Sequence, residues 1–303
     1  MRKPEKISYE EFIKTITMFW IDRELEDSIS REVNEMVTSM ENKLTSINTK
    51  EGLIDFIKAD KTSLTNILAL MEIPEEKFKR IVSLLRKERK FTFATEWSLD
   101  KTRNMMLENP SYMEDICELL MNGINSEKYK RKIPDFYRDS FKIDSSTLLR
   151  LTNREELTRL AKRQIEVKYN NSVSLVIFKK IEDAIKLTCD LEGITYVKNK
   201  TASLFEKNFN FIIPNENSPR ILINCSYNIT TSSTQSKFAE TFIDARNKAR
   251  LQNKRIITVA IIEGAGWVGR QSDLKTIFEY ADYVLNLSNI GLLGEIIKYG
   301  MEE

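Results

Sequence analysis

The first half of the chain carries apolar residues at helical spacing. Through residues 25–47 the apolar positions recur every three or four residues, and the same pattern continues through most of residues 50–90. This spacing places side chains on one face of an α-helix. Ser8, followed three residues later by Glu11, forms a capping box that predicts a helix start. The pattern predicts a helical domain over residues 1–150.

Beyond residue 150 the pattern changes to short apolar runs that alternate with helices. An apolar side over residues 172–191 predicts a helix that ends at Gly193. Residues 209–213 and 221–225 are apolar runs, and the Pro/Asn/Ser-rich turn between them predicts a hairpin. Further strands are expected at residues 194–197, 256–262 and 283–287, and a further helix at residues 236–252. We therefore expect an α+β or α/β fold, in which the helical domain precedes a mixed sheet flanked by helices over residues 151–303.

Composition removes several classes of chemistry. The chain has no histidine, which excludes Ser-His-Asp and Cys-His nucleophile systems and His-ligated metals. The three cysteines, Cys117, Cys189 and Cys225, lie far apart and form no CxxC spacing, so we expect buried thiols in a reducing cytosol. No window approaches the run of about 20 apolar residues that a membrane span needs, and the first residues lack an apolar signal segment. A cytoplasmic protein without membrane contact is expected.

Charge is balanced overall but unevenly distributed. The chain has 47 basic and 45 acidic residues. Residues 154–180 hold seven basic residues against three acids, residues 237–255 hold six against two, and residues 263–303 hold three against seven. Two basic zones of net +4 therefore precede an acidic tail of net −4. Composition alone fits either solvated helix faces or phosphate-binding surfaces.

The second half contains five segments in a recognisable order. They are residues 209–213, 222–227 and 236–240, the Gly-x-Gly-Trp loop at 264–267, and residues 281–287. In order and spacing they resemble the DpnII/MboI family of type II restriction endonucleases. The helical first half is also similar to that family, including its basic segment at residues 84–90.

The resemblance implies a restriction-endonuclease-like, PD-(D/E)XK nuclease fold. In that fold an acid on the second strand and an acid-x-lysine motif on the third strand converge at the hairpin to hold Mg²⁺, which activates water. The resemblance also implies double-stranded DNA as the partner, a short palindromic target of the GATC type, and a homodimer or pairing with a related nuclease subunit.

This chain departs from the family at the metal site itself. Asn210 stands at the position of the first metal-binding aspartate, Asn224 at that of the glutamate, and Ser226 at the third site position. Two amides offer neutral carbonyls but none of the negative charge that draws Mg²⁺ out of water. The metal ligands are therefore unknown, and Mg²⁺ is expected only if the protein cuts.

Three hypotheses remain open at this point. In the first, the protein keeps the DNA-binding surface and does not cut, acting as a subunit or regulator. In the second, it cuts with displaced carboxylates, for which the candidates are Glu182, Glu206, Glu240 and Glu263. The third is a protein-interaction scaffold without nucleic acid.

Candidate DNA contacts cluster in the hydroxyl-rich segment before the expected helix at 236–252. A loop of short donors at a helix start can contact phosphates, or its last residues can simply cap the helix. The candidates in this segment are Thr231, Ser232, Ser233 and Gln235, followed by Lys237, which also belongs to the candidate catalytic set. Trp267 could stack on a base or fill the core. Lys162, Arg163 and Lys168 are candidate phosphate contacts.

Overall fold

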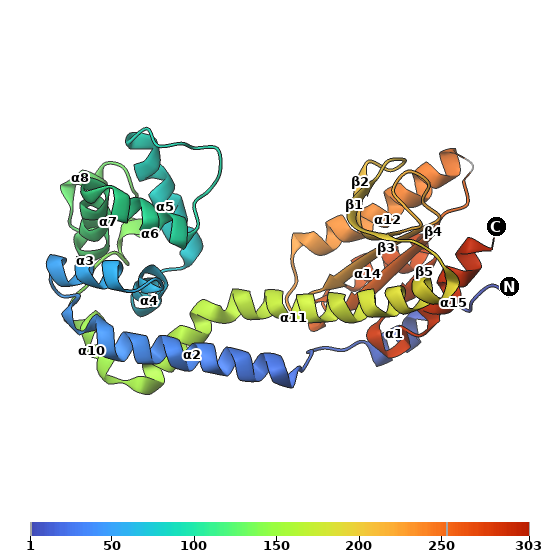
Figure 1. Ribbon diagram of the computed structural model, residues 1–303, viewed down its shortest axis with the longest axis horizontal. Helices are drawn as coiled ribbons and strands as arrows, with labels where there is room; N and C mark the ends of the chain where they lie inside the picture. Colours follow the sequence, from blue (N-terminus) through green and yellow to red (C-terminus); the bar gives the residue numbers. More distant parts are fainter. Residues whose placement is uncertain (1, 253, 303) are drawn as a thin grey trace. The chain divides into compact units, whose positions relative to one another are not determined.

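The protein divides into two compact units in a computed structural model that describes residues 2–252 and 254–302. One unit is Arg23–Asn170, and the other joins the first 22 residues to the chain from Asn171 onward. Helices make up the first unit, and a five-stranded sheet with flanking helices makes up the second, so the fold is α+β (Figure 1). We call them the helical unit and the sheet unit.

These units differ from the expected division into residues 1–150 and 151–303. Leu157, Ala161 and Ile165 pack in the core of the helical unit, which draws the chain up to Asn170 into it. Near the N-terminus, Phe12 packs in a core of the sheet unit and not in the helical unit. Apolar contacts, rather than the change in sequence pattern, thus set the boundaries.

The helical unit is built from short helices around one core. They are α2 (Arg23–Lys43), η1 (Leu44–Ser46), α3 (Lys50–Ala59), α4 (Ser63–Leu70), α5 (Glu75–Glu88), α6 (Leu99–Glu108), α7 (Pro110–Asn122), α8 (Glu127–Lys130), α9 (Asp135–Arg138), α10 (Ser145–Leu149), η2 (Arg150–Thr152) and the first part of α11 (Arg154–Glu192). In α5 the buried positions include Phe78, Ile81, Val82 and Leu85, which is the face that the helical spacing predicts.

The sheet unit contains α1 (Tyr9–Thr15), the remainder of α11, and five strands in the spatial order β1-β2-β3-β4-β5. The elements are β1 (Val197–Ala202), β2 (Lys207–Ile213), β3 (Ile221–Tyr227), α12 (Ser233–Leu251), β4 (Ile257–Glu263), α13 (Ala265–Val268), α14 (Gln271–Tyr280), β5 (Tyr283–Leu285), η3 (Leu287–Asn289) and α15 (Leu292–Met301). Strands β1, β2 and β3 pair antiparallel, whereas β3, β4 and β5 pair parallel.

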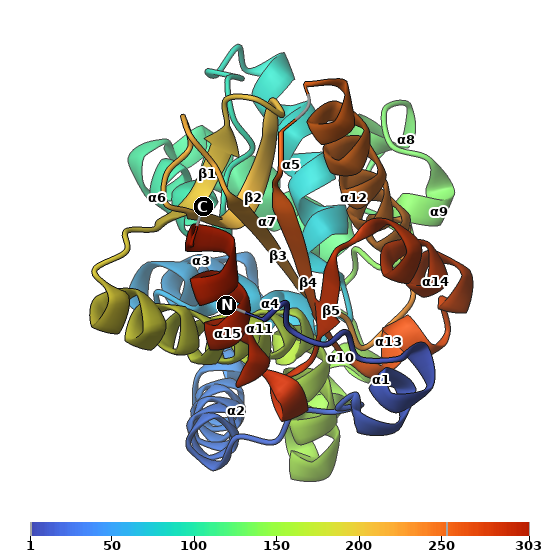
Figure 2. The same ribbon diagram turned by 90° about the vertical axis from the view of Figure 1, so that its right-hand side faces the viewer.

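Helices cover both faces of this sheet, with α12 and α14 on one side and α11 and α15 on the other (Figure 2). Phe242 of α12 shares a core cluster with Ile262 of β4 and Ile277 of α14. On the other face, a Cβ at Gly300 of α15 would lie 2.8 Å from Ile221, so this glycine allows close packing. Because both faces are covered, every residue of β4 is buried, including Thr258 and Glu263, and its largely apolar sequence is typical of such a strand.

The N-terminal segment closes the end of the sheet where β4 stops. The backbone N–H of Gly264 donates to Thr17 O at 2.9 Å, and that of Ala265 donates to Met18 O at 3.0 Å. Gly264 has φ of 104°, a conformation that favours glycine. Its Cα also lies so close to Asn228 that a Cβ would approach Asn228 O to 2.3 Å. The first 20 residues are therefore part of the sheet unit.

Most of the elements expected from sequence are present, with shifted ends. The β2–β3 hairpin, α12 and β4 are confirmed. The strand expected at residues 194–197 lies instead at Val197–Ala202, where a polar sequence forms an exposed edge strand. The helix expected at 172–191 is the second half of the 39-residue α11. In the part of the chain that the structure describes, no helix is both long and apolar enough to cross a membrane.

Candidate functional site

Strand β2 loses its ladder pairing on both sides at Asn210. Toward β1, the pairs Lys198↔Phe211 and Lys200↔Phe209 flank it without including it. Toward β3, the register ends at Phe211↔Ile223. Opposite it, Asn199 of β1 has φ of 52°, which distorts the edge strand at the same level. The hairpin therefore opens at the position where the resemblance places the metal site.

Side-chain amides replace the missing ladder bonds. The backbone N–H of Asn210 donates to Asn224 Oδ1 at 3.0 Å, and the backbone N–H of Cys225 donates to Asn210 Oδ1 at 2.8 Å. Asn210 Nδ2 lies 3.5 Å from Asn199 Oδ1 on the other side. Asn224 is only 8% exposed, so its amide is largely withdrawn from water. Both amide oxygens at the candidate metal positions are thus engaged by the protein backbone.

A cavity of about 460 Å³ lies beside Asn210. Glu182 of α11 and Lys198 of β1 both line it and pair directly with each other, with Lys198 Nζ 2.9 Å from Glu182 Oε1. The remaining lining residues are Leu175, Phe178, Lys179, Asn199 and Phe211. Of the displaced carboxylates considered from sequence, Glu182 therefore lies at the opened hairpin.

Lys198 fixes the charge state of Glu182. Its hydrogen bond lowers the pKa of the Glu182 carboxyl, and the hydroxyl of Tyr196, 3.2 Å from Glu182 Oε1, adds to this effect. The carboxylate therefore stays ionised at neutral pH and is held by a cation.

These residues do not fit a magnesium site. Mg²⁺ requires anionic oxygens that are free to coordinate it, whereas Asn210 and Asn224 are neutral and their oxygens accept backbone N–H groups. Glu182 supplies one carboxylate, which is paired with Lys198. Among the described residues, no three Asp, Glu, Cys or His side chains gather closely enough to hold a metal ion.

The other candidate catalytic residues lie apart from this cavity. Ser226 Oγ accepts a hydrogen bond from Asn228 Nδ2 at 2.6 Å. Glu240 and Lys237 are exposed on α12, and in the described part of the chain no hydrogen bond or ion pair joins either one to Asn210 or Asn224.

The two further displaced acids have structural partners. Glu206 pairs with Lys248 at 3.4 Å on the surface. Glu263 is 1% exposed and accepts backbone N–H groups from Thr17 at 2.7 Å and Leu287 at 2.6 Å. Burial raises the pKa of Glu263, although these two N–H groups oppose the shift. Its carboxyl group therefore holds the N-terminal segment in place.

The sequence matches the family described as the BanI C-terminal domain over residues 131–299, which is more than half of the chain. The protein belongs to this family. It is a type II restriction-endonuclease-related family, so the expected kind of protein is confirmed, while the narrower DpnII/MboI assignment stays a prediction. No curated protein matches the chain.

In this BanI C-terminal domain family member, the candidate phosphate-binding hydroxyls lie at the start of α12. Thr231, Ser232 and Ser233 are exposed, and Ser232 Oγ lies 2.5 Å from Thr234 Oγ1. Gln235 is instead fully buried, and its Oε1 accepts the backbone N–H of Ser232 at 2.8 Å. Gln235 thus caps the helix, whereas the three hydroxyl residues remain accessible.

Trp267 is a core residue rather than a surface stacking platform. Its side chain is 0% exposed, and its ring packs edge-on against Phe238 at 5.5 Å between centroids. In this conformation no base can reach it, because α12 and α14 enclose the cluster to which it belongs.

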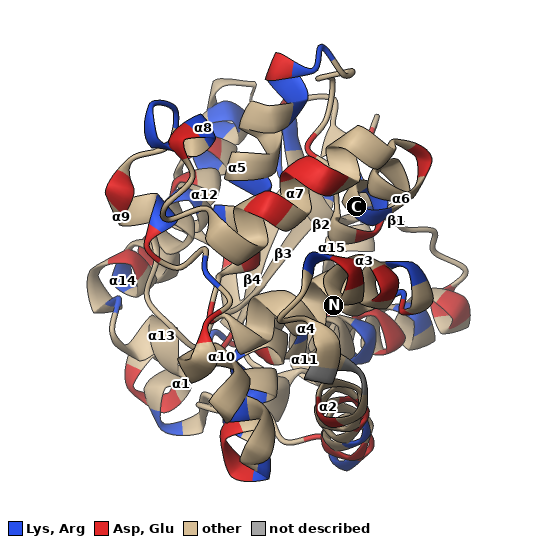
Figure 3. Cartoon of the chain, turned by 90° about the vertical axis from the view of Figure 1, so that its left-hand side faces the viewer, with Lys and Arg blue, Asp and Glu red and all other residues tan. Residues whose placement is uncertain are grey.

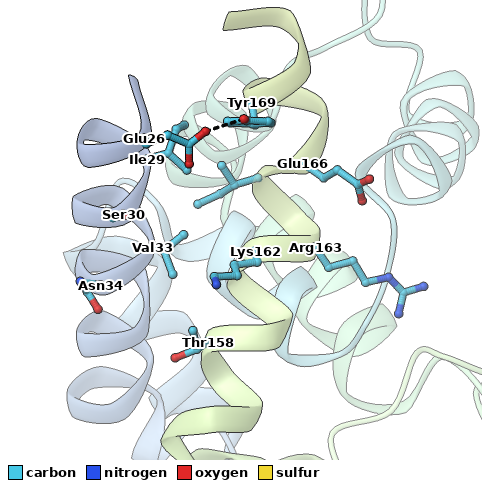
Figure 4. A pocket seen from close by; sticks show the side chains of 11 residues that line it. Glu26, Ile29, Ser30, Val33, Asn34, Thr158, Lys162, Arg163, Glu166 and Tyr169 are labelled. Atoms are coloured by element: carbon cyan, nitrogen blue, oxygen red, sulfur yellow. Dashed lines mark hydrogen bonds between the residues drawn. The ribbon is translucent and has the colours of Figure 1, made fainter. Parts of the chain in front are cut away.

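Lys162, Arg163 and Lys168 belong to the helical unit, whereas the hairpin belongs to the sheet unit. Lys168 pairs with Glu32 at 2.6 Å, and Arg163 reaches Glu72 at 3.4 Å. Lys162 points into a cavity of about 590 Å³ between α2 and α11, whereas Arg163 points away from α2 (Figure 4). Lys168 is therefore engaged by an acid, and Lys162 is the more available cation.

Sequence reasoning missed Lys198 and Asn199 at this site. Their strand is polar and was not expected at residues 197–202, so nothing placed their side chains beside Asn210. The signal that could have found them is the pair Lys198 and Lys200 in a short polar segment, because exposed lysines are typical of edge strands.

Proposed function

We propose that this restriction-endonuclease family member binds double-stranded DNA and does not cut it. The observation that carries the proposal is the pair of hydrogen bonds in which the amide oxygens of Asn210 and Asn224 accept backbone N–H groups. A nuclease of this fold needs free acidic oxygens where these amide oxygens accept backbone N–H groups. A non-cutting subunit or a regulator of a restriction-modification system is the role that fits these features.

Incubation of the purified protein with plasmid DNA and Mg²⁺ tests this proposal. We expect intact plasmid under conditions in which an active restriction enzyme digests it. A discrete ladder of fragments contradicts the proposal. A parallel incubation with Mn²⁺ extends the test, because Mn²⁺ also accepts oxygen ligands and binds more tightly than Mg²⁺.

The second candidate function is an active magnesium-dependent endonuclease whose catalytic carboxylates are displaced from the usual strand positions. Glu182 and Lys198 favour it, because an acid and a lysine lie together beside Asn210 in the same cavity. Under this alternative, Glu182→Gln abolishes cleavage. The matched control is Glu206→Gln, which removes an exposed carboxylate that pairs with Lys248 and does not line this cavity.

DNA binding itself is tested by a gel shift on duplex DNA at rising salt. We expect retardation that weakens as salt increases, because phosphate contacts release counterions. The exposed hydroxyls at the start of the 19-residue helix α12, with Lys237 beside them, support a phosphate contact there. The absence of a shift at low salt favours the protein-interaction scaffold.

We further propose that the protein works as a homodimer or beside a related nuclease subunit, since a palindromic target presents two equivalent half-sites. Light scattering coupled to size-exclusion chromatography measures the mass in solution. A mass of twice 35.4 kDa supports the homodimer. A single chain in solution, and a single chain in the complex with DNA, contradict the homodimer.

A further inference from the structure

Two basic segments of the helical unit lie side by side. Lys132 Nζ, after α8, lies 2.8 Å from Glu88 Oε1 at the end of α5. Asp115 of α7 pairs with both Arg89 and Lys128 and so links the same two segments. We call this surface, made by residues 87–90 and 127–132, the α5–α8 patch. Lysines and arginines gather around α5 and α8 in Figure 3.

The α5–α8 patch keeps a net positive charge after its internal ion pairs are counted. Arg86 is 1% exposed and is left out of the count. Residues 87–90 hold three cations and one acid, and residues 127–132 hold four cations and one acid, which gives +2 and +3. Asp115 and Glu118, which contact Lys128, reduce the total from +5 to +3. Lys87, Lys90 and Arg131 are exposed, and within the described residues no ion pair engages them.

Exposed aromatic rings accompany these cations. Phe136 is 79% exposed and Tyr137 46% exposed, with 5.5 Å between their ring centroids. Phe93, on the loop after α5, is 59% exposed. Cations at the end of a helix are explained by the helix dipole. The helix dipole gives no reason for three rings of this size to face water.

The rings and the cations follow the length of α5. Near its first turn, Lys77 Nζ lies 5.9 Å from the ring centroid of Tyr137 and 3.1 Å from Ser140 Oγ. At its last turn, Glu88 meets Lys132. Eleven residues of α-helix separate these contacts, which is about 16 Å. A full helical turn of B-DNA is about 34 Å long. The surface therefore spans roughly half a turn.

We infer that the α5–α8 patch, together with the exposed ring of Phe136, is a second DNA-binding surface. Lys87, Lys90 and Arg131 contact phosphates of duplex DNA, and Phe136 contacts sugar and base edges. Unpaired cations match the anionic backbone, and exposed rings match the apolar faces between phosphates. The inference rests on the proposed DNA binding and adds a contact that belongs to the helical unit.

Fluorescence anisotropy with a labelled duplex of about 20 base pairs, measured over a series of salt concentrations, tests the patch. Lys90→Gln/Arg131→Gln should weaken binding about tenfold at moderate salt and reduce the slope of log K against log salt by about 2, since two phosphate contacts are lost. The matched control is Lys58→Gln/Lys61→Gln, which removes two exposed lysines on and just after α3. It should leave both quantities near the wild-type values.

A second pair of variants tests the aromatic contact. Phe136→Ser should weaken binding about tenfold with an unchanged salt slope, because it removes apolar area buried on binding and no charge. Its control is Phe19→Ser, which removes a ring of 61% exposure from the sheet unit. Thermal melting of each variant verifies that the fold is retained.

The outcomes separate this inference from the proposed function. If the wild-type protein binds the duplex and the patch variants behave as their controls do, the inference is overturned while DNA binding stands. If the wild-type protein fails to bind at low salt, both are overturned.

Discussion

Asn210 and Asn224 each bond to the other's strand. The Asn224 amide oxygen accepts the backbone N–H of Asn210, and the Asn210 amide oxygen accepts the backbone N–H of Cys225 next to Asn224. The two side chains therefore act as substitute rungs where the β2–β3 ladder has ended. In a metal-dependent nuclease the oxygens at these positions face a cation. Here the same positions stabilise the hairpin without one.

Removing either amide should destabilise the fold. Asn224→Ala leaves the partly buried backbone N–H of Asn210 without its acceptor, and we expect a loss of about 1–2 kcal/mol in the free energy of unfolding. Asn210→Ala should cost a similar amount through Cys225. Urea denaturation measures both, with Asn247→Ala on the exposed side of α12 as the control. The double variant should lose less than the sum, because the two bonds act at one opening of the hairpin. Full additivity contradicts the coupling.

Glu182 should titrate below the usual glutamate range. Because Lys198 lowers the folded-state pKa, this pair contributes stability above the unfolded-state pKa and loses it as the pH falls through the folded-state value. Carboxylate chemical shifts from an NMR pH titration measure the pKa directly. In Lys198→Met the Glu182 pKa should rise toward its ordinary value. An unchanged Glu182 pKa in Lys198→Met would show that Lys198 does not lower it.

Glu263 should have the opposite pH dependence. Burial raises its folded-state pKa, so its contribution to stability is fully present below the unfolded-state pKa and is lost as the pH rises through the folded-state value. Relative to Glu263→Gln, the wild-type protein should therefore become less stable between acidic and neutral pH. Urea denaturation at several pH values measures the difference. A pH-independent difference is incompatible with a raised pKa.

The same substitution should loosen the N-terminal segment. The Glu263 carboxyl group accepts N–H groups from Thr17 and Leu287 with separate oxygens, and a glutamine offers only one acceptor. Hydrogen exchange at Thr17 or Leu287 should accelerate in Glu263→Gln, while exchange in β3 should not change. If the amides of Thr17 and Leu287 exchange in the variant as slowly as in the wild-type protein, Glu263 does not have this role.

Trp267 should behave as packing rather than as a binding residue. Trp267→Ala removes a fully buried ring and should cost about 3–5 kcal/mol of stability. Trp267→Phe should cost less, because the indole Nε1 has no hydrogen-bond partner among the described residues. The midpoint of urea unfolding ranks the two variants. DNA affinity of the folded Phe variant should match that of the wild-type protein, and a large loss would return Trp267 to the DNA-contact set.

Sequence pattern alone located the hairpin and the buried β4, because both are apolar runs with clear boundaries. It misplaced β1, whose residues are polar and exposed and whose pairing depends on β2. The candidate position Asn210 came from the family resemblance, which puts the first metal-binding aspartate there. Its bonds could not be predicted, since they require a local break in the ladder that only the packed sheet defines. The burial of Glu263 likewise depends on a segment nearly 250 residues away in sequence.

The division into units determines which unit can fold first while the chain is being synthesised. The helical unit is contiguous, so all of its residues have been synthesised once Asn170 has been added. The sheet unit needs Phe12 near the beginning, and α15, which ends at Met301. During synthesis the helical unit can therefore fold first. At that stage the strands on which α1 packs have not yet been made, so α1 has no packing partner. A fragment that starts at residue 23 would keep the whole sequence of the helical unit, but the sheet unit would lack the segment that Glu263 holds.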